Sequence, residues 1–107
     1  MKVIWTREAL ADLADIATYY TTNASPSIAE AVGRRFVDVV ERIRSVPLSA
    51  PRVRHRSQIR VAAVVRYPFR IFYRVRGDVI HILHIRHTSR QPLTGLNEPP
   101  QLAMVDR

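Results

Sequence analysis

The sequence contains no cysteine, which excludes disulfide bonds and thiolate metal sites. It also has no long apolar run, because no stretch approaches the ~20 apolar residues that a membrane-spanning helix needs. Acidic residues interrupt the first segment, MKVIWTREALADL, where a signal peptide would carry an unbroken apolar core. We therefore expect a cytoplasmic protein with no membrane segment, and the length of 107 residues predicts a single domain.

Acidic residues are scarce in the second half of the chain. Residues 1–51 hold six basic and six acidic side chains, whereas residues 52–107 hold eleven arginines against three acidic residues. The whole formal net charge of +8 therefore belongs to the second half. Arginine suits bidentate contacts with carboxylates and phosphates. We expect the partner to be an acidic protein or a polyanion.

Two amphipathic helices are predicted in the first half. Thr6 is a suitable N-cap, and the apolar residues after it recur at three- and four-residue spacing, which predicts a helix over residues 6–22. Ser25 and Pro26 have the residue types of an N-cap and a first helical residue, so a second helix is predicted over residues 26–45, ended by Pro47. Each helix carries an apolar stripe, so the pair should pack as a hairpin against a sheet. The first stripe contains Ala9, Leu10, Leu13, Ile16, Ala17 and Tyr20, and the second contains Ala29, Val32, Phe36, Val39, Val40 and Ile43.

The segment 66–92 carries the strongest strand signal. Gly77 and Asp78 lie between two runs of β-branched and aromatic residues, which predicts two strands joined by a two-residue turn. Strict alternation along both strands then predicts the cross-strand pairs. One face should hold Val75 with Ile80, Tyr73 with Ile82, and Ile71 with His84. The other should hold Arg76 with Val79, Arg74 with His81, Phe72 with Leu83, and Arg70 with Ile85.

Two consequences for the histidines follow from this register. His87 should lie opposite Pro68, on the same face as Arg70. His81 and His84 should lie on opposite faces, so a His-x-x-His metal site is not expected. Tyr73 should pack in the core.

The remaining segments complete the predicted fold. Residues 2–5 and 59–65 read as further strands, and residues 47–58 read as a basic loop. The predicted class is α+β: an N-terminal strand, then a helical hairpin packed on one face of a mainly antiparallel sheet of three or four strands. We expect one domain over residues 1–92 and an extended or mobile tail over residues 93–107.

This ordered set of features resembles the RelE/ParE family of toxins from bacterial type II toxin–antitoxin systems, also labelled plasmid stabilisation proteins. The matching features are the Thr-Arg-Glu-Ala helix start at residues 6–9, the stop at Pro47 and the basic loop. The most specific features are YPFRIFYRV at residues 67–75 and IHILHIRHTSR at residues 80–90. The similarity covers residues 2–92 and implies the fold described above.

The resemblance implies a toxin that is held inactive in a hetero-oligomer with a cognate antitoxin, an acidic and partly disordered protein. It implies no cofactor and no metal. The basic face with its apolar strip would suit an acidic, amphipathic segment. The predicted phosphate or antitoxin contacts are Arg54, Arg56, Arg70, Phe72, Arg74, Arg76, His81 and Leu83.

The family divides into two activities, and the sequence favours one of them. RelE-like members cut messenger RNA in the ribosome, whereas ParE-like members poison DNA gyrase. The resemblance implies that Arg70 and Arg90 match phosphate-contacting arginines of RelE-like members, and His87 could transfer a proton. RelE-like members commonly add lysines or a glutamate from the preceding loop and a tyrosine or histidine near the end. This basic loop offers no lysine or acid, and no tyrosine follows Tyr73, so the set is incomplete.

Two long helices resemble the ParE-like members more than the RelE-like ones. The interpretation is therefore a gyrase-poisoning toxin without hydrolytic activity. The alternatives are a metal-independent, ribosome-dependent endoribonuclease and, from another class, a non-catalytic nucleic-acid-binding module.

Overall fold

The helix caps expected from the sequence begin both helices. Thr6 Oγ1 accepts a hydrogen bond from the Ala9 amide at 3.2 Å, and Ser25 Oγ accepts one from the Ile28 amide at 3.2 Å. The first helix, α1, spans Arg7–Asn23, and the second, α2, spans Pro26–Ser45. Neither helix is long and apolar enough to cross a membrane, as far as the described residues show.

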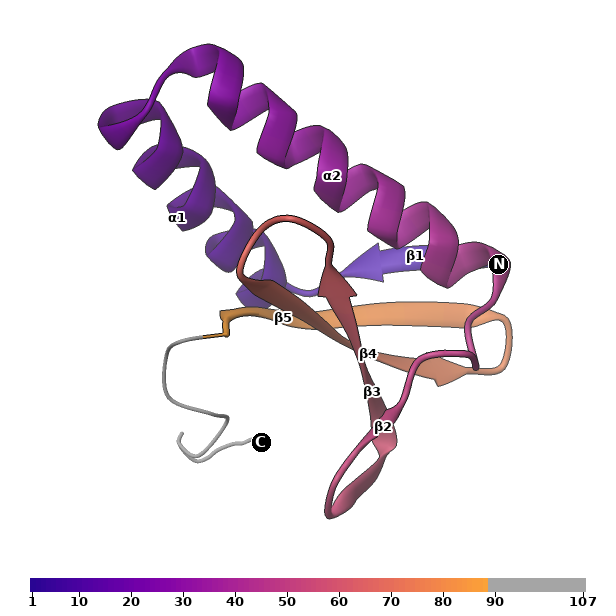
Figure 1. Ribbon diagram of the computed structural model, residues 1–107. Helices are drawn as coiled ribbons and strands as arrows, with labels where there is room; N and C mark the ends of the chain where they lie inside the picture. The colour runs from indigo at the N-terminus through magenta and orange to yellow at the C-terminus, as the bar shows by residue number, and fades with distance from the viewer. Residues whose placement is uncertain (89–107) are drawn as a thin grey trace.

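The computed structural model describes residues 1–88 and shows the helical hairpin above a five-stranded sheet (Figure 1). The strands are β1 (Lys2–Trp5), β2 (Arg52–Val53), β3 (Arg56–Val64), β4 (Phe69–Arg76) and β5 (Val79–His87). Their order in the sheet is β1-β5-β4-β3-β2, in which β1 runs parallel to β5 and the other neighbours are antiparallel. The α+β class is confirmed. The predicted strand number is too low, because the predicted basic loop contains β2 and the first residues of β3.

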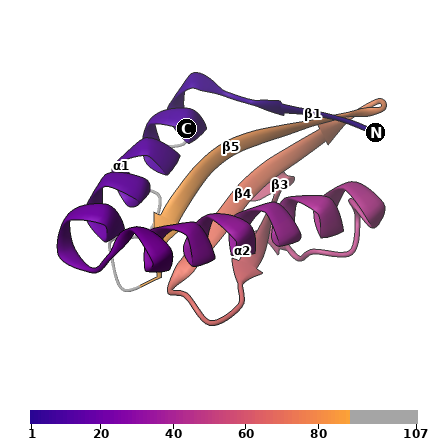
Figure 2. The same ribbon diagram turned by 90° about the horizontal axis from the view of Figure 1, so that it is seen from above.

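The two helices contact the sheet differently. Viewed from above, α2 crosses β4 and β3, whereas α1 lies beside β5 (Figure 2). The predicted stripe of α2 is confirmed, since its buried side chains are Val32, Phe36, Val39, Val40 and Ile43. In α1, Ala9 is buried, but Leu10 from the predicted stripe is 52 % exposed. Within residues 1–88, β1 pairs with β5 only as far as Ile82, so α1 has less sheet to cover than α2, which crosses the sheet.

The core face of the sheet, defined as the face under α2, holds the best-buried side chains. Ile71 and Tyr73 of β4 and Ile80 and Ile82 of β5 are fully buried. The Tyr73 hydroxyl donates a hydrogen bond to the Pro47 carbonyl at 2.8 Å, which ties the segment after α2 to the core. Burial raises the pKa of the Tyr73 hydroxyl above its usual value of 10.0.

Candidate partner-binding face of the sheet

Strand β5 contains one more residue than its partner β4. Tyr73 pairs with Ile82 as predicted, but Phe72 pairs with His84, so Leu83 has no partner on β4. This arrangement is a β-bulge, which shifts every later pair by one residue. The predicted pairs between the turn and the bulge are confirmed, and the predicted pairs beyond the bulge are wrong.

The bulge exchanges side chains between the two faces. Ile85 faces Ile71 and is 4 % exposed, so it joins the core instead of lying opposite Arg70. His84 moves to the outer face, defined as the face of the sheet turned away from α2. Arg70 faces Arg86, a residue that sequence reasoning did not select for the site.

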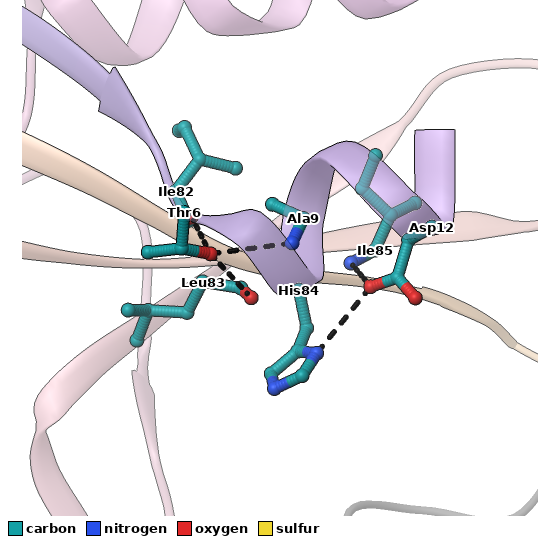
Figure 3. Close-up of polar contacts among 7 residues, drawn as sticks. All are labelled: Thr6, Ala9, Asp12, Ile82, Leu83, His84 and Ile85. Carbon is teal, nitrogen blue, oxygen red and sulfur yellow. Dashed lines mark hydrogen bonds and ion pairs between the residues drawn. The ribbon is translucent and has the colours of Figure 1, made fainter. Parts of the chain in front are cut away.

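Two side chains from the start of α1 hold the bulge (Figure 3). Thr6 Oγ1 donates to the Ile82 carbonyl at 2.8 Å and lies 3.1 Å from the Leu83 carbonyl. Asp12 Oδ2 accepts a hydrogen bond from the Ile85 amide at 2.9 Å and lies 3.3 Å from His84 Nδ1. Since β1 ends at Trp5, no strand within residues 1–88 pairs with this edge of β5 beyond Ile82, and these side chains bond to its backbone instead.

The outer face carries an apolar centre between two basic clusters. One cluster contains the cross-strand pair Arg74 and His81 together with Arg76, and the other contains Arg70, Arg86 and His84. Phe72 and Leu83 lie between them. Arg74 follows Arg70 by four positions on β4, so the clusters lie about 13 Å apart along the strand. The bulge places His81 and His84 on the same face, so the prediction of opposite faces is wrong.

Several side-chain nitrogens on the outer face have no hydrogen-bond partner within residues 1–88. Arg74 Nε, His81 Nδ1 and Arg86 Nε are buried atoms with no hydrogen-bond partner in the described chain. Burial, with a smaller effect from Arg76, lowers the pKa of the Arg74 guanidinium. A buried donor without a partner costs about 1–3 kcal/mol. The outer face therefore has hydrogen-bonding capacity that residues 1–88 leave unused.

Residues 3–92 match the family described as "ParE toxin of type II toxin-antitoxin system, parDE". The chain belongs to the ParE toxin family. The structure is similar to one from the "Chromosomal ParDE TA system from P. aeruginosa", with 31 % sequence identity and a TM-score of 0.74. That similarity covers 83 % of this chain and 97 % of the other. No curated protein matches the sequence.

In this ParE-family chain, the structure places His87 and Arg70, two of the predicted ribonuclease residues, on different faces of the sheet. His87 pairs with Phe69, not Pro68, and its ring packs edge-on against the buried Phe69 ring at 5.3 Å. It therefore lies on the core side of the sheet, away from Arg70, and the predicted shared face is wrong. Arg90 and the predicted tail lie outside the described residues. No group of three or more His, Asp or Glu side chains within residues 1–88 is placed to hold a metal ion.

The predicted contacts Arg54 and Arg56 lie apart from the outer face. They belong to the hairpin formed by β2 and β3, whose two-residue turn consists of Arg54 and His55. Arg54 is exposed and Arg56 is half-buried. The ParE-family chain thus presents two separate basic surfaces, the outer face of the sheet and this hairpin.

Proposed function

We propose that this chain is a growth-inhibiting toxin that poisons DNA gyrase and is neutralised by a cognate antitoxin bound to its outer face. The observation behind the proposed antitoxin site is that Arg74 Nε, His81 Nδ1 and Arg86 Nε are buried on that face without a hydrogen-bond partner in the described chain. Membership of the ParE toxin family supports a toxin paired with an antitoxin. The chemistry of the outer face supports where that antitoxin binds.

An acidic protein segment would provide hydrogen-bond acceptors for the unpartnered arginine nitrogens of the outer face. Carboxylate oxygens are strong acceptors for the guanidinium groups of Arg74 and Arg86, whose Nε atoms lack acceptors in the described chain. Phe72 and Leu83 provide apolar area between the basic clusters, as in the centre of a protein interface. We therefore expect the antitoxin segment to carry an apolar side chain flanked by acidic residues about 13 Å apart.

Two features of the fold support gyrase as the target. The helical hairpin is long, with 17 residues in α1 and 20 in α2. His87 and Arg70, two of the groups expected for RNA cleavage, also lie on different faces, because His87 packs against Phe69. The test is to incubate the purified chain, free of antitoxin, with gyrase and supercoiled DNA. We expect inhibition and accumulation of cleavage complexes; normal supercoiling without such complexes would disprove the gyrase target.

A second candidate function, messenger RNA cleavage, has one observation in its favour. Asp12 lies 3.3 Å from His84 Nδ1, on the same face as the phosphate-binding candidates Arg70 and Arg86. A carboxylate that orients an imidazole in this way leaves Nε2 to act as a base. This function predicts cleaved message in a translating extract, lost in His84→Ala and retained in His87→Ala. Intact message would exclude it.

A further inference from the structure

The β2–β3 hairpin differs chemically from the outer face. Its projecting segment, residues 52–58, reads RVRHRSQ and contains one apolar residue, Val53. Figure 1 shows its turn projecting from the sheet on the side away from the helices. Protein interfaces bury an apolar centre, which the outer face has in Phe72 and Leu83 and this hairpin lacks. The hairpin therefore suits a ligand that is recognised by charge.

The sequence around the hairpin contains no acidic residue. No acidic residue occurs between Glu41 and Asp78, and this stretch contains ten arginines. Arg52 and Arg54 are exposed, and neither forms an ion pair with a carboxylate within residues 1–88. A concentrated positive field of this kind attracts polyanions.

The base of the hairpin is fixed by hydrogen bonds. The Val61 amide donates to the Pro51 carbonyl at 3.0 Å. The Arg60 guanidinium donates to the carbonyls of Leu48 at 3.1 Å and Ala50 at 2.8 Å, so Arg60 is engaged within the fold. A preformed hairpin presents its arginines with little further loss of conformational entropy on binding.

The tip of the hairpin adds a third polar side chain. His55 has a φ of 66°, a left-handed conformation that glycine or asparagine adopts with less strain. The histidine at this turn places an imidazole beside Arg54. Its ring can supply a further hydrogen-bond donor at the turn that carries Arg54.

We propose that the β2–β3 hairpin binds the phosphodiester backbone of nucleic acid, with Arg52, Arg54 and His55 contacting phosphate oxygens. Such contacts position a protein on nucleic acid without reading its sequence. The proposal goes beyond the proposed function and does not require it. Where gyrase is the target, the DNA that gyrase holds is an available ligand.

The test measures binding of the full chain to a labelled DNA duplex, and to single-stranded RNA of equal length, by fluorescence anisotropy over a range of salt. The Arg52→Gln, Arg54→Gln double variant should bind about tenfold more weakly and lower the slope of log K against log salt by about 2, since each lost phosphate contact contributes about 0.9. Tighter binding of the duplex assigns the hairpin to DNA, and tighter binding of the single strand assigns it to RNA.

Three further double variants keep the test decisive. Arg34→Gln with Arg44→Gln removes the same charge from exposed positions of α2 and should leave the slope unchanged within about 0.5. Arg52→Lys with Arg54→Lys should retain most of the slope, because it keeps the charge. Equal losses from the α2 and hairpin variants would overturn the proposal.

The last double variant, Arg70→Gln with Arg76→Gln, tests the outer face. A larger loss from this pair than from the hairpin pair would place the nucleic-acid site on the outer face and overturn the proposal. Circular dichroism confirms that each variant is folded. The gyrase assay is scored separately, so failure of one proposal leaves the other distinguishable.

Discussion

The two faces of the β4–β5 hairpin show how one pair of strands serves two purposes. On the core face, Ile71, Tyr73, Ile80 and Ile82 are fully buried, and the Tyr73 hydroxyl has an acceptor. On the outer face, Arg74, His81 and Arg86 each have a buried nitrogen without a hydrogen-bond partner in the described chain. Substitutions on the core face should therefore cost stability. Substitutions on the outer face should cost binding, and some should increase the stability of the chain without its partner.

The largest expected effect on stability lies on the core face. Ile82→Ala removes a fully buried side chain and should lower the free energy of unfolding by about 2–5 kcal/mol, through lost burial and the cavity left behind. Val37→Ala, at a 60 % exposed position of α2, should change it by less than about 0.5 kcal/mol. Urea denaturation measures both. Similar losses in the two variants would show that the core is misplaced.

The bulge that separates the two faces depends on Asp12. Asp12→Ala should cost about 1–3 kcal/mol, because the Ile85 amide loses its acceptor. Asp15→Ala, on the exposed side of α1, is the matched control and should be nearly neutral. Hydrogen exchange at the Ile85 amide gives a local readout. Unchanged protection of that amide in Asp12→Ala would show that Asp12 does not hold the bulge.

Tyr73 gives the core face a dependence on pH. Its raised pKa means that the unfolded chain ionises near 10.0 while the folded chain keeps the proton. The contribution of Tyr73 to the free energy of unfolding is therefore fully present below about pH 10 and is lost as the pH rises through the pKa of the folded state. Tyr73→Phe should cost about 1 kcal/mol at neutral pH through the lost hydrogen bond to Pro47.

Tyr73→Phe should also reduce the loss of stability at alkaline pH, as measured by denaturation at several pH values. Tyr20, whose pKa is also raised by burial, would account for the remaining decline. Tyr19→Phe, at a residue that is 57 % exposed, is the comparison and should change the curve only slightly, because Tyr19 contributes less than burial to the raised pKa of Tyr20. An alkaline decline of equal steepness in Tyr73→Phe and the parent chain would contradict this assignment.

The smallest expected effect has the opposite sign. Arg74→Met removes a partly desolvated guanidinium whose Nε has no acceptor, so it should raise the stability of the chain without antitoxin by up to about 1 kcal/mol. Arg76→Met, at an exposed position on the same strand, should change it little. Thermal unfolding distinguishes them. Destabilisation by Arg74→Met would mean that Arg74 has a role within the fold.

The sequence predicts the parts of this fold that depend on local signals. Both helix caps, the stripe of α2 and the turn at Gly77 follow from short patterns, and the register is right up to the pair of Tyr73 and Ile82. Strand β2 was missed because two paired residues, Arg52 and Val53, show no periodicity.

The bulge is not a local property of β5. Thr6 and Asp12, whose side chains hydrogen-bond to the bulge, lie far from it in the sequence. Thr6 is 76 residues from Ile82, and Asp12 is 73 residues from Ile85. The sequence contains one sign of a bulge. Strict alternation places a histidine in the core opposite Ile71 and an isoleucine on the basic face opposite Arg70, and both positions are unfavourable. A bulge at Leu83 corrects both. Without it, His84 and Arg86 could not be assigned to the outer face.

The most direct test of the outer face as the proposed antitoxin site is the affinity of the purified chain for its cognate antitoxin. Arg70→Glu with Arg74→Glu should weaken that complex at least about 100-fold, since the new charges repel an acidic segment. The matched pair Arg34→Glu with Arg44→Glu, on the exposed side of α2, should weaken it less than about threefold. Titration calorimetry compares both pairs with the parent chain. Unchanged affinity in the Arg70 and Arg74 variant would contradict the proposed site.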